Sequence, residues 1–262
     1  MNNDNKSSGG RTRKIIVLLA VILIVVGVGI MLFQAISIQN AKNKDAELTS
    51  STTTTQTSTE QATVANKIDF DSLKKKNKEI YAWIKVPGTK VNYPIVQSST
   101  DDAFYLKHSA TDKSYSSSGA VYTQSMNKKD FTDRVTVIYG HNGYGDTYFT
   151  TLHRFEKQDF FEKHKKFVIY TANEKLTYRI VSAFKYDDRH IMNSFDFHDD
   201  NIFKEFIEMV QNPTSSNKNV SNSLDKEITI DDNIVVLSTC FTGQKSNRYL
   251  VCGVLVKNEK TN

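Results

Sequence analysis

Near the N-terminus the chain carries 24 consecutive residues without a charged side chain, at 15–38 (IIVLLAVILIVVGVGIMLFQAISI). A helix of this length rises about 36 Å, which exceeds the ~30 Å hydrocarbon core of a bilayer. A cleaved signal peptide is the alternative, but its apolar region is shorter and ends at small residues. The run ends Phe33-Gln34-Ala35-Ile36 without a clear cleavage pattern, so it predicts a retained transmembrane signal anchor over 15–38.

Basic residues flank this run unequally. Four precede it and two follow it closely, namely Lys6, Arg11, Arg13 and Lys14 against Lys42 and Lys44. Loops rich in Lys and Arg stay on the cytoplasmic side of a membrane. We therefore expect residues 1–14 to form a cytoplasmic tail, and the chain after Ile38 to lie outside the cell, giving a single-pass protein of the cell membrane.

The next segment, 39–66, contains the Thr/Ser tract TSSTTTTQTSTEQAT. Such a tract has too few apolar side chains to offset the entropy lost on ordering it, so it predicts a linker. Residues 67–262 then form one domain of nearly 200 residues, long enough for a substantial core. Its formal charge of +3 is spread along the sequence, which gives no indication of nucleic-acid binding.

The domain is predominantly β in pattern. Eight β-rich runs are separated by turn signals, at 83–86, 91–96, 119–124, 134–141, 166–171, 176–186, 233–239 and 248–256. An amphipathic helix is expected first, over 68–83, and shorter helical pieces lie between the strands, at 100–108, 146–164 and 199–212. Short strands with helices inserted in their connections predict a closed or nearly closed β-barrel.

The two cysteines lie on the last two strands. Seven loop-like residues, FTGQKSN, separate those strands and predict an antiparallel hairpin centred near Gln244. In that register Cys240 faces Arg248 and Cys252 faces Val236. The cysteines are then about 13 Å apart along the ladder, beyond the ~7 Å Cα separation that a disulfide allows.

The surroundings of the two thiols differ. Cys252 lies mid-strand in an apolar run, where a free cysteine commonly fills a core. Cys240 ends its strand opposite a guanidinium, and a nearby cation favours the nucleophilic thiolate. On this segment alone, a second buried thiol at a strand end is an equally good interpretation of Cys240.

A thiol nucleophile also needs a group that moves protons, and the best of the six histidines is His141. It follows directly on the strand pattern RVTVIY, where a rigid scaffold can hold a catalytic side chain. His153 and His164 read as surface or half-buried residues of helical segments. His190 and His198 lie among aspartates, but their spacing fits no defined metal-ligand pattern, so we expect neither a metal nor a cofactor.

Three motifs in a fixed order, VIYGHN (137–142), LSTC (237–240) and NRYLV (247–251), make the chain resemble the class B sortases. The resemblance extends over about 70–257 and includes WIKVPGTKVNYPIVQ (83–97) and YLKH (105–108). It implies a Gram-positive, membrane-tethered cysteine transpeptidase. The implied fold is an eight-stranded sortase-like β-barrel with an N-terminal helix and inserted short helices, which makes 67–262 an extracellular catalytic domain.

The resemblance also assigns roles to residues. Cys240 would be the nucleophile, His141 the general acid and base, and Arg248 the group that binds substrate carbonyls or the developing oxyanion. The further residues expected to contact substrate are Ser238, Thr239 and Asn142, and the segment 187–211 would help to form the groove. The loop FTGQKSN contains no carboxylate, so the sequence leaves open which group orients His141.

The implied substrates are secreted proteins with a C-terminal sorting signal resembling Asn-Pro-x-Thr, cleaved after Thr. The acceptor would be an amine of a lipid-linked peptidoglycan precursor or of a cell-wall cross-bridge. Three alternatives remain on the sequence: a surface cysteine protease that releases its product to water, a sortase that polymerises pilins, and a tethered adhesion domain without catalytic activity.

Overall fold

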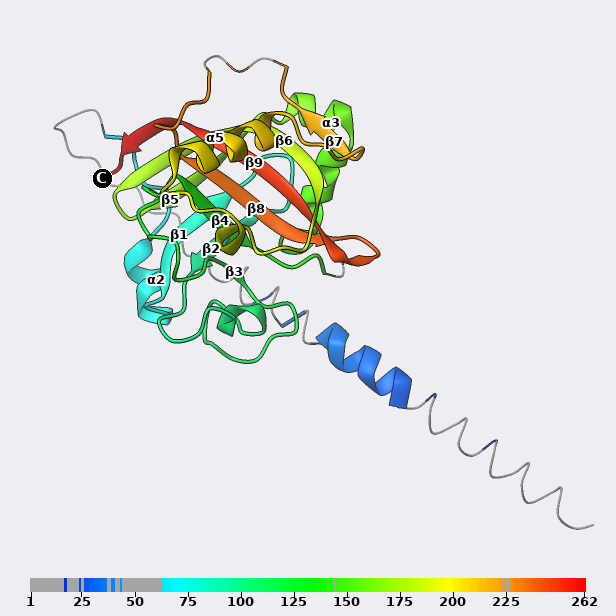
Figure 1. Ribbon diagram of the computed structural model, residues 1–262. Coiled ribbons are helices and arrows are strands. Elements are labelled where there is room, and N and C mark those ends of the chain that lie inside the picture. The colour runs from blue at the N-terminus through cyan, green and yellow to red at the C-terminus, as the bar shows by residue number, and fades with distance from the viewer. Residues whose placement is uncertain are drawn as a thin grey trace, which may run out of the picture.

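The computed structural model describes residues 63–143, 145–222, 224 and 227–262, and in the N-terminal region residues 17, 24, 26–36, 39–40 and 43 (Figure 1). Within the described residues of the domain there are nine strands: β1 Ile80–Lys85, β2 Asn92–Val96, β3 Val121–Tyr122, β4 Val135–Tyr139, β5 Lys166–Thr171, β6 Glu174–Asp187, β7 Lys218–Val220, β8 Ile234–Phe241 and β9 Gln244–Lys260. The helices are α2 Phe70–Lys76, η1 Phe104–Leu106, η2 Thr150–Glu156, α3 Gln158–Lys163, α4 Ile191–Ser194 and α5 Asp200–Gln211.

Eight strands close into a barrel. Their order is β5-β1-β2-β3-β4-β8-β9-β6, and a further pairing of β5 with β6 completes the circle. The predicted eight-stranded barrel is therefore confirmed, with each β-rich run of the sequence contributing one strand. The short strand β7 was not predicted, and it pairs with β6 beyond the end of the β5–β6 pairing, through Phe184 opposite Lys218 and Ser182 opposite Val220.

The β8–β9 hairpin has the predicted register. Cys240 pairs with Arg248 and Val236 pairs with Cys252. The loop is shorter than expected, because β8 continues to Phe241 and β9 begins at Gln244, which leaves two turn residues. The second of them, Gly243, has a φ of 74°, in the left-handed region where glycine is favoured, and this lets the chain turn so tightly.

The N-terminal helix is shorter than the predicted range 68–83. It ends at Lys76, and the rest of the apolar pattern belongs to β1. Asn77 causes the change, because its backbone is extended (φ −149°, ψ 116°) and its amide nitrogen donates to the Tyr105 hydroxyl and the Ala110 carbonyl, each at 2.8 Å. A side chain bonded to a distant segment redirects the backbone in a way that apolar spacing does not reveal.

The other helical predictions are confirmed to different degrees. The range 146–164 divides at Lys157 into η2 and α3, and 100–108 shortens to the single turn η1. The range 199–212 corresponds to α5, whose apolar stripe of Phe203, Phe206, Ile207 and Val210 is buried.

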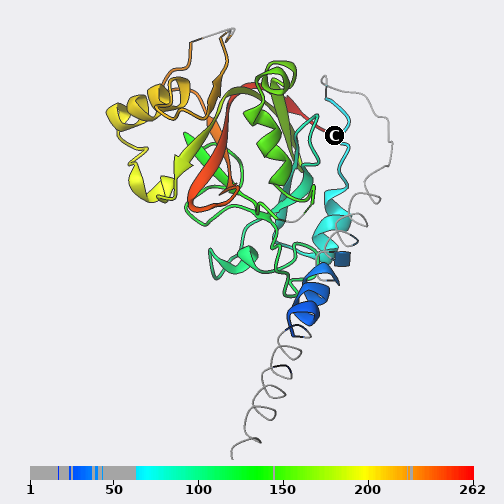
Figure 2. The ribbon, with the colours of Figure 1, turned by 90° about the vertical axis from the view of Figure 1, so that its right-hand side faces the viewer.

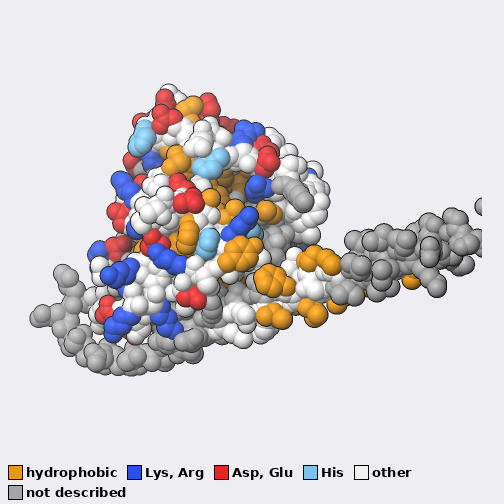
Figure 3. All heavy atoms as spheres, turned by 90° about the horizontal axis from the view of Figure 1, so that it is seen from below, with side chains coloured by type: hydrophobic (Ala, Val, Ile, Leu, Met, Phe, Trp, Pro, Cys, Tyr) orange, Lys and Arg blue, Asp and Glu red, His pale blue; other side chains and the backbone are white. Residues whose placement is uncertain are grey.

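Helices cover the barrel on opposite sides, α5 on one and α2 on the other (Figure 2). Three apolar clusters result: one fills the barrel, one lies between α5 and the outer faces of β4, β8 and β9, and one lies beneath α2. Acidic and basic side chains are interspersed on the face shown in Figure 3, in keeping with the small net charge expected for the domain.

The predicted membrane anchor lies only partly within the described residues. Of 15–38, the structure describes residues 17, 24 and 26–36, whereas the tail 1–14 and most of the linker 39–66 lie outside. In the part of the chain that the structure describes, no helix is both long enough and apolar enough to span a membrane.

Glu79 ties the start of β1 to the loop that carries η1. Its carboxylate accepts hydrogen bonds from Ser99 at 2.8 and 3.0 Å and from the Tyr105 hydroxyl at 2.5 Å, and forms an ion pair with Lys113 at 2.8 Å. Burial by itself raises the pKa of this carboxyl, but the contacts with Lys113, Tyr105 and Ser99 outweigh it and lower the pKa to about 2.

The pKa of Glu79 leads to a prediction about acid stability. Because it falls from an ordinary 4.5 to about 2 on folding, the carboxylate stabilises the fold above about pH 4.5, and this contribution is lost as the pH falls toward 2. Glu79→Gln should lower the free energy of unfolding by about 1–3 kcal/mol at neutral pH. In urea unfolding, the gap to the wild type should close below about pH 4.5.

Glu205→Gln is the matched control, because Glu205 lies on the exposed side of α5. Its free energy of unfolding should follow that of the wild type at every pH. If the difference in free energy of unfolding between Glu79→Gln and the wild type stayed constant as the pH fell toward 2, the lowered pKa of Glu79 would be contradicted.

Candidate active site

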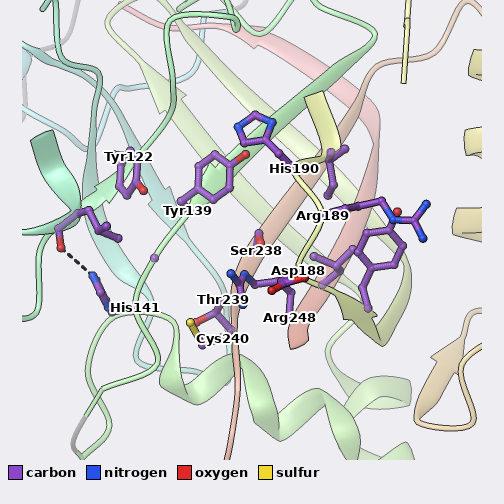
Figure 4. Close-up of a pocket in the computed structure, with 15 residues that line it drawn as sticks. Tyr122, Tyr139, His141, Asp188, Arg189, His190, Ser238, Thr239, Cys240 and Arg248 are labelled. Carbon is purple, nitrogen blue, oxygen red and sulfur yellow. Dashed lines mark hydrogen bonds between the residues drawn. The ribbon is translucent and has the colours of Figure 1, made fainter. Parts of the chain in front are cut away.

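A cleft of about 260 Å³ opens where β4 and β8 end (Figure 4). These two strands pair in parallel, with Tyr139 opposite Ser238, so the residues that follow them emerge at the same edge of the barrel. One wall comes from β3, β4 and η1, and the other from residues 188–191. Of the six predicted site residues, five line this cleft: His141, Ser238, Thr239, Cys240 and Arg248.

Cys240 lies near the end of β8 with an exposed side chain. Because paired residues of an antiparallel ladder share a face, the half-buried Arg248 side chain lies on the same face of the hairpin. One guanidinium nitrogen of Arg248 donates to the Asn247 carbonyl at 3.1 Å. The predicted neighbourhood of thiol and guanidinium is therefore present in the fold.

Strand alternation places Ser238 on the same face of β8 as Cys240, whereas Thr239, between them in the sequence, is on the opposite face. Both residues line the cleft, but both are almost fully buried. Within the described part of the chain, the hydroxyl oxygen of Thr239 has no hydrogen-bond partner.

His141 follows β4 and is held by a backbone carbonyl. Its Nε2–H donates to the carbonyl of Leu106 at 2.7 Å, as the dashed line in Figure 4 shows. A hydrogen bond at one ring nitrogen fixes the orientation of the imidazole and leaves the other, Nδ1, for proton transfer. Leu106 thus supplies the orienting group that the sequence left open, and a backbone oxygen has no signature in side-chain letters.

Gly140 lets the chain leave β4 at this point. A Cβ atom here would lie 2.6 Å from the Phe149 ring, a distance that real contacts do not reach. The Gly140 amide donates to the Ser238 carbonyl at 3.1 Å, which continues the β4–β8 pairing up to the histidine. The glycine before His141 is therefore a requirement of close packing.

Two stacked tyrosines line the cleft beside His141, and sequence reasoning did not identify them. The rings of Tyr122 and Tyr139 are 5.4 Å apart. Burial, together with the negative charge available at Cys240, raises the pKa of Tyr122 to about 12, so its phenol stays protonated at neutral pH. The Tyr139 hydroxyl is buried and finds no partner among the described residues.

The opposite wall is held by its own polar contacts. His190 Nε2 lies 2.6 Å from the side-chain oxygen of Gln124, and its Nδ1 accepts from the Asn193 amide at the start of α4. Arg189 pairs with Asp187 at 2.6 Å. Among the residues that the structure describes, no group of three or more His, Cys, Asp or Glu side chains is placed to hold a metal ion.

Asn142 is the predicted site residue that does not line this cleft. Its amide nitrogen donates instead to the carbonyl of Cys240 at 3.1 Å and to the hydroxyl of Thr242 at 2.9 Å. The structure therefore brings Asn142 to the backbone of the β8–β9 hairpin, and a direct contact with substrate stays a prediction.

Cys252 belongs to the core, as its apolar run predicted. It is 0% exposed and lies in the cluster between the barrel and α5. Burial raises the pKa of its thiol well above the usual range, against a smaller opposite effect of a hydrogen bond with Ser182. Neither cysteine forms a disulfide.

Comparison with known proteins identifies the class of enzyme. A family model described as sortase domain matches residues 84–256, and the chain therefore belongs to the sortase family. Within it, the relatives are class B enzymes: sortase B of Staphylococcus aureus is 30% identical over 190 residues, which cover 72% of this chain and 75% of that protein. Sortases of this class are cysteine transpeptidases.

Solved structures agree with this assignment. Sortase B of Bacillus anthracis in complex with AAEK1 superposes with a TM-score of 0.70 at 25% identity, over 85% of this chain and 99% of that one. A class B sortase of Streptococcus pyogenes involved in pilus biogenesis has a TM-score of 0.61 at 32% identity, over 72% and 98% of the two chains. The barrel and the inserted helices are thus those of a class B sortase.

The contrast between the two thiols predicts selective labelling. In the native protein a disulfide reagent should react quickly with one thiol, Cys240, because Cys252 is buried and its raised pKa keeps it protonated. The second thiol, Cys252, should react only after the protein is unfolded. Thiol release followed by absorbance checks both stages.

Single substitutions assign the reacting group. Cys240→Ala should remove the fast phase, and the matched control Cys252→Ala should keep it. Fast native labelling of the Cys240→Ala protein would show that the burial of Cys252 has been misjudged.

Proposed function

We propose that this sortase cleaves the C-terminal sorting signal of secreted proteins and joins them to an amine of the cell wall, with Cys240 as nucleophile. The observation that carries the proposal is the register of the β8–β9 hairpin, which sets an exposed thiol opposite the guanidinium of Arg248. His141, which follows the parallel neighbouring strand β4, lines the same cleft.

The first half of the reaction forms a thioester. The Cys240 sulfur attacks the carbonyl carbon of the scissile peptide bond as a thiolate, with its proton on His141, and the carbonyl oxygen becomes an oxyanion. Arg248 stabilises that oxyanion, because a fixed guanidinium in a partly dry cleft offers charge-assisted donors where negative charge develops. When the carbon–nitrogen bond breaks, His141 protonates the leaving amine.

The second half transfers the acyl group. An incoming amine attacks the thioester, gives up a proton to His141, and expels the Cys240 thiolate as a new amide bond forms. The thioester keeps the acyl group activated until the amine arrives. We infer that this amine belongs to a lipid-linked peptidoglycan precursor or a cell-wall cross-bridge.

The cleft of about 260 Å³ beside Cys240 has room for part of a peptide as the donor substrate. We infer a sorting signal resembling Asn-Pro-x-Thr, cut after Thr. It would lie between the stacked Tyr122 and Tyr139 on one side and the segment 187–211 on the other. Ser238 and Thr239 are expected to contact it at the strand end. The buried hydroxyls of Tyr139 and Thr239 have no hydrogen-bond partners within the described residues.

We propose a location at the outer face of the cell membrane. The uncharged run 15–38 would anchor the chain in a single pass, with residues 1–14 in the cytoplasm and the catalytic domain outside. A tethered enzyme meets its secreted substrate and a lipid-linked acceptor on the same surface, so the linker 39–66 would let the domain reach both.

The reaction can be tested with the full chain purified in detergent and a panel of Asn-Pro-x-Thr peptides. Adding a short peptide with a free N-terminal amine should yield a ligated product by mass spectrometry, and Cys240→Ala should abolish both cleavage and ligation. Hydrolysis that no amine redirects would instead indicate a protease, and full activity of Cys240→Ala would indicate that the site lies elsewhere.

Pilin polymerisation is a second candidate, because the S. pyogenes relative named above is a class B sortase involved in pilus biogenesis. A lysine-bearing acceptor peptide tests it in the same assay. Preference for the lysine side chain over the N-terminal amine would favour pilin joining, and the reverse preference would favour wall anchoring.

The role of Arg248 predicts a specific kinetic loss. Arg248→Lys keeps the charge but loses the planar pair of donors, so kcat should fall by about 10²–10³ while KM for the peptide changes less. The matched control is Arg189→Ala, because Arg189 also lines the cleft but its guanidinium is paired with Asp187. Equal losses in the two variants would exclude a special role for Arg248.

A further inference from the structure

Behind the cleft, two side chains from different elements hold the backbone carbonyl of Cys240. Asn142, which follows β4, donates to this oxygen from 3.1 Å, and His153 of η2 places its Nε2 at 3.0 Å. The carbonyl lies where the β8–β9 register shifts, between Cys240 and Phe241. These donors therefore fix the peptide that follows the thiol at the point where the regular ladder ends.

His153 is itself held on every side. Its Nδ1 lies 2.5 Å from a carboxylate oxygen of Glu156, and the other oxygen of Glu156 accepts from the Asn217 amide at 3.1 Å. The imidazole stacks on the Tyr249 ring with centroids 4.9 Å apart and meets the edge of Phe241 at 5.7 Å. Its side chain is 13% exposed, so the ring has little freedom to turn.

Counting donors shows what His153 does. The amide nitrogen of Asn142 also lies 3.1 Å from Nε2, but its two hydrogens have acceptors in the oxygens of Cys240 and Thr242. A carbonyl oxygen and a carboxylate can only accept, so both ring nitrogens carry a proton: Nε2–H donates to the Cys240 carbonyl and Nδ1–H donates to the carboxylate of Glu156. A carbonyl oxygen has two lone pairs, so it can accept from both Asn142 and His153.

We propose that His153, oriented by Glu156, is a positioning residue for the Cys240 thiol. Its hydrogen bond holds the Cys240–Phe241 peptide and hence the direction in which the sulfur points. Asn142, the second donor to this carbonyl, is the residue that follows His141 in the chain. The Cys240 carbonyl therefore links the backbone beside the nucleophile to the backbone beside the histidine. The inference rests on the proposed role of Cys240 as nucleophile.

Such a role affects the reaction step more than peptide binding. His153 does not line the cleft, and its contact with Cys240 is made through the backbone. A small displacement of a reacting atom is enough to slow a reaction by about 10- to 100-fold. Loss of this hydrogen bond should therefore lower kcat by that order and leave KM for the peptide nearly unchanged.

Three substitutions of His153 separate its contacts. His153→Gln can place an amide nitrogen near the position of Nε2 and so keep a donor for the Cys240 carbonyl. His153→Asn reaches only the position of Nδ1, toward Glu156. His153→Phe keeps the aromatic stack on Tyr249 but donates to neither group. The full chain and the peptide–amine ligation assay are used throughout, with thermal unfolding to confirm that each variant is folded.

The expected order of kcat is wild type close to His153→Gln, with His153→Asn and His153→Phe lower by about 10- to 100-fold. A ring that serves only for packing would give the opposite result, with His153→Phe as active as the wild type. That outcome, or equal losses in the Gln and Asn variants, would overturn the inference.

The proposed function can fail separately from this inference. If Cys240→Ala remains active, the nucleophile has been misassigned and His153 cannot be positioning it. If Cys240→Ala is inactive and the folded His153→Phe protein retains the wild-type kcat, the nucleophile stands and the positioning role is wrong.

Discussion

The site depends on the way β8 pairs with its two neighbours. Antiparallel pairing with β9 sets Cys240 opposite Arg248, and parallel pairing with β4 carries the chain to His141 at the same edge. Backbone hydrogen bonds fix both relationships, and a slip of one residue in either register would move a side chain to the other face of the sheet. The backbone of the barrel therefore places the proposed reacting groups before any side-chain contact is made.

Side-chain contacts then refine this arrangement from two directions. Glu79 holds Tyr105, and the next residue, Leu106, offers its carbonyl to His141. From the other side His153 holds the carbonyl of Cys240. Both contacts are made to backbone carbonyl oxygens, those of Leu106 and Cys240. A side-chain substitution at Leu106 or Cys240 therefore leaves the acceptor in place. Such supports suit the proposed reaction, in which a thioester on Cys240 has to wait for an incoming amine.

The sequence was informative where the physics is local or repeats with a simple period. Strand patterns predicted all eight barrel strands, and loop composition predicted the pairing of Cys240 with Arg248. The sequence was less informative where contacts with residues far away in the chain determine the local structure. Asn77 ends α2 through bonds to a remote loop, and the acceptor for His141 is a backbone atom. His153 read as an ordinary half-buried helical residue, because only the folded chain brings η2 under the hairpin.

The edge strand β7 has a consequence for how such enzymes diversify. The chain leaves the barrel after Asp187 and returns at Lys218, which pairs with Phe184, so its exit and entry points are neighbours on β6. The segment between them, with α4 and α5, forms one wall of the cleft but contributes no strand to the closed barrel. The two ends of this segment therefore lie side by side, so it can be exchanged between relatives without moving the strands that carry Cys240, His141 and Arg248.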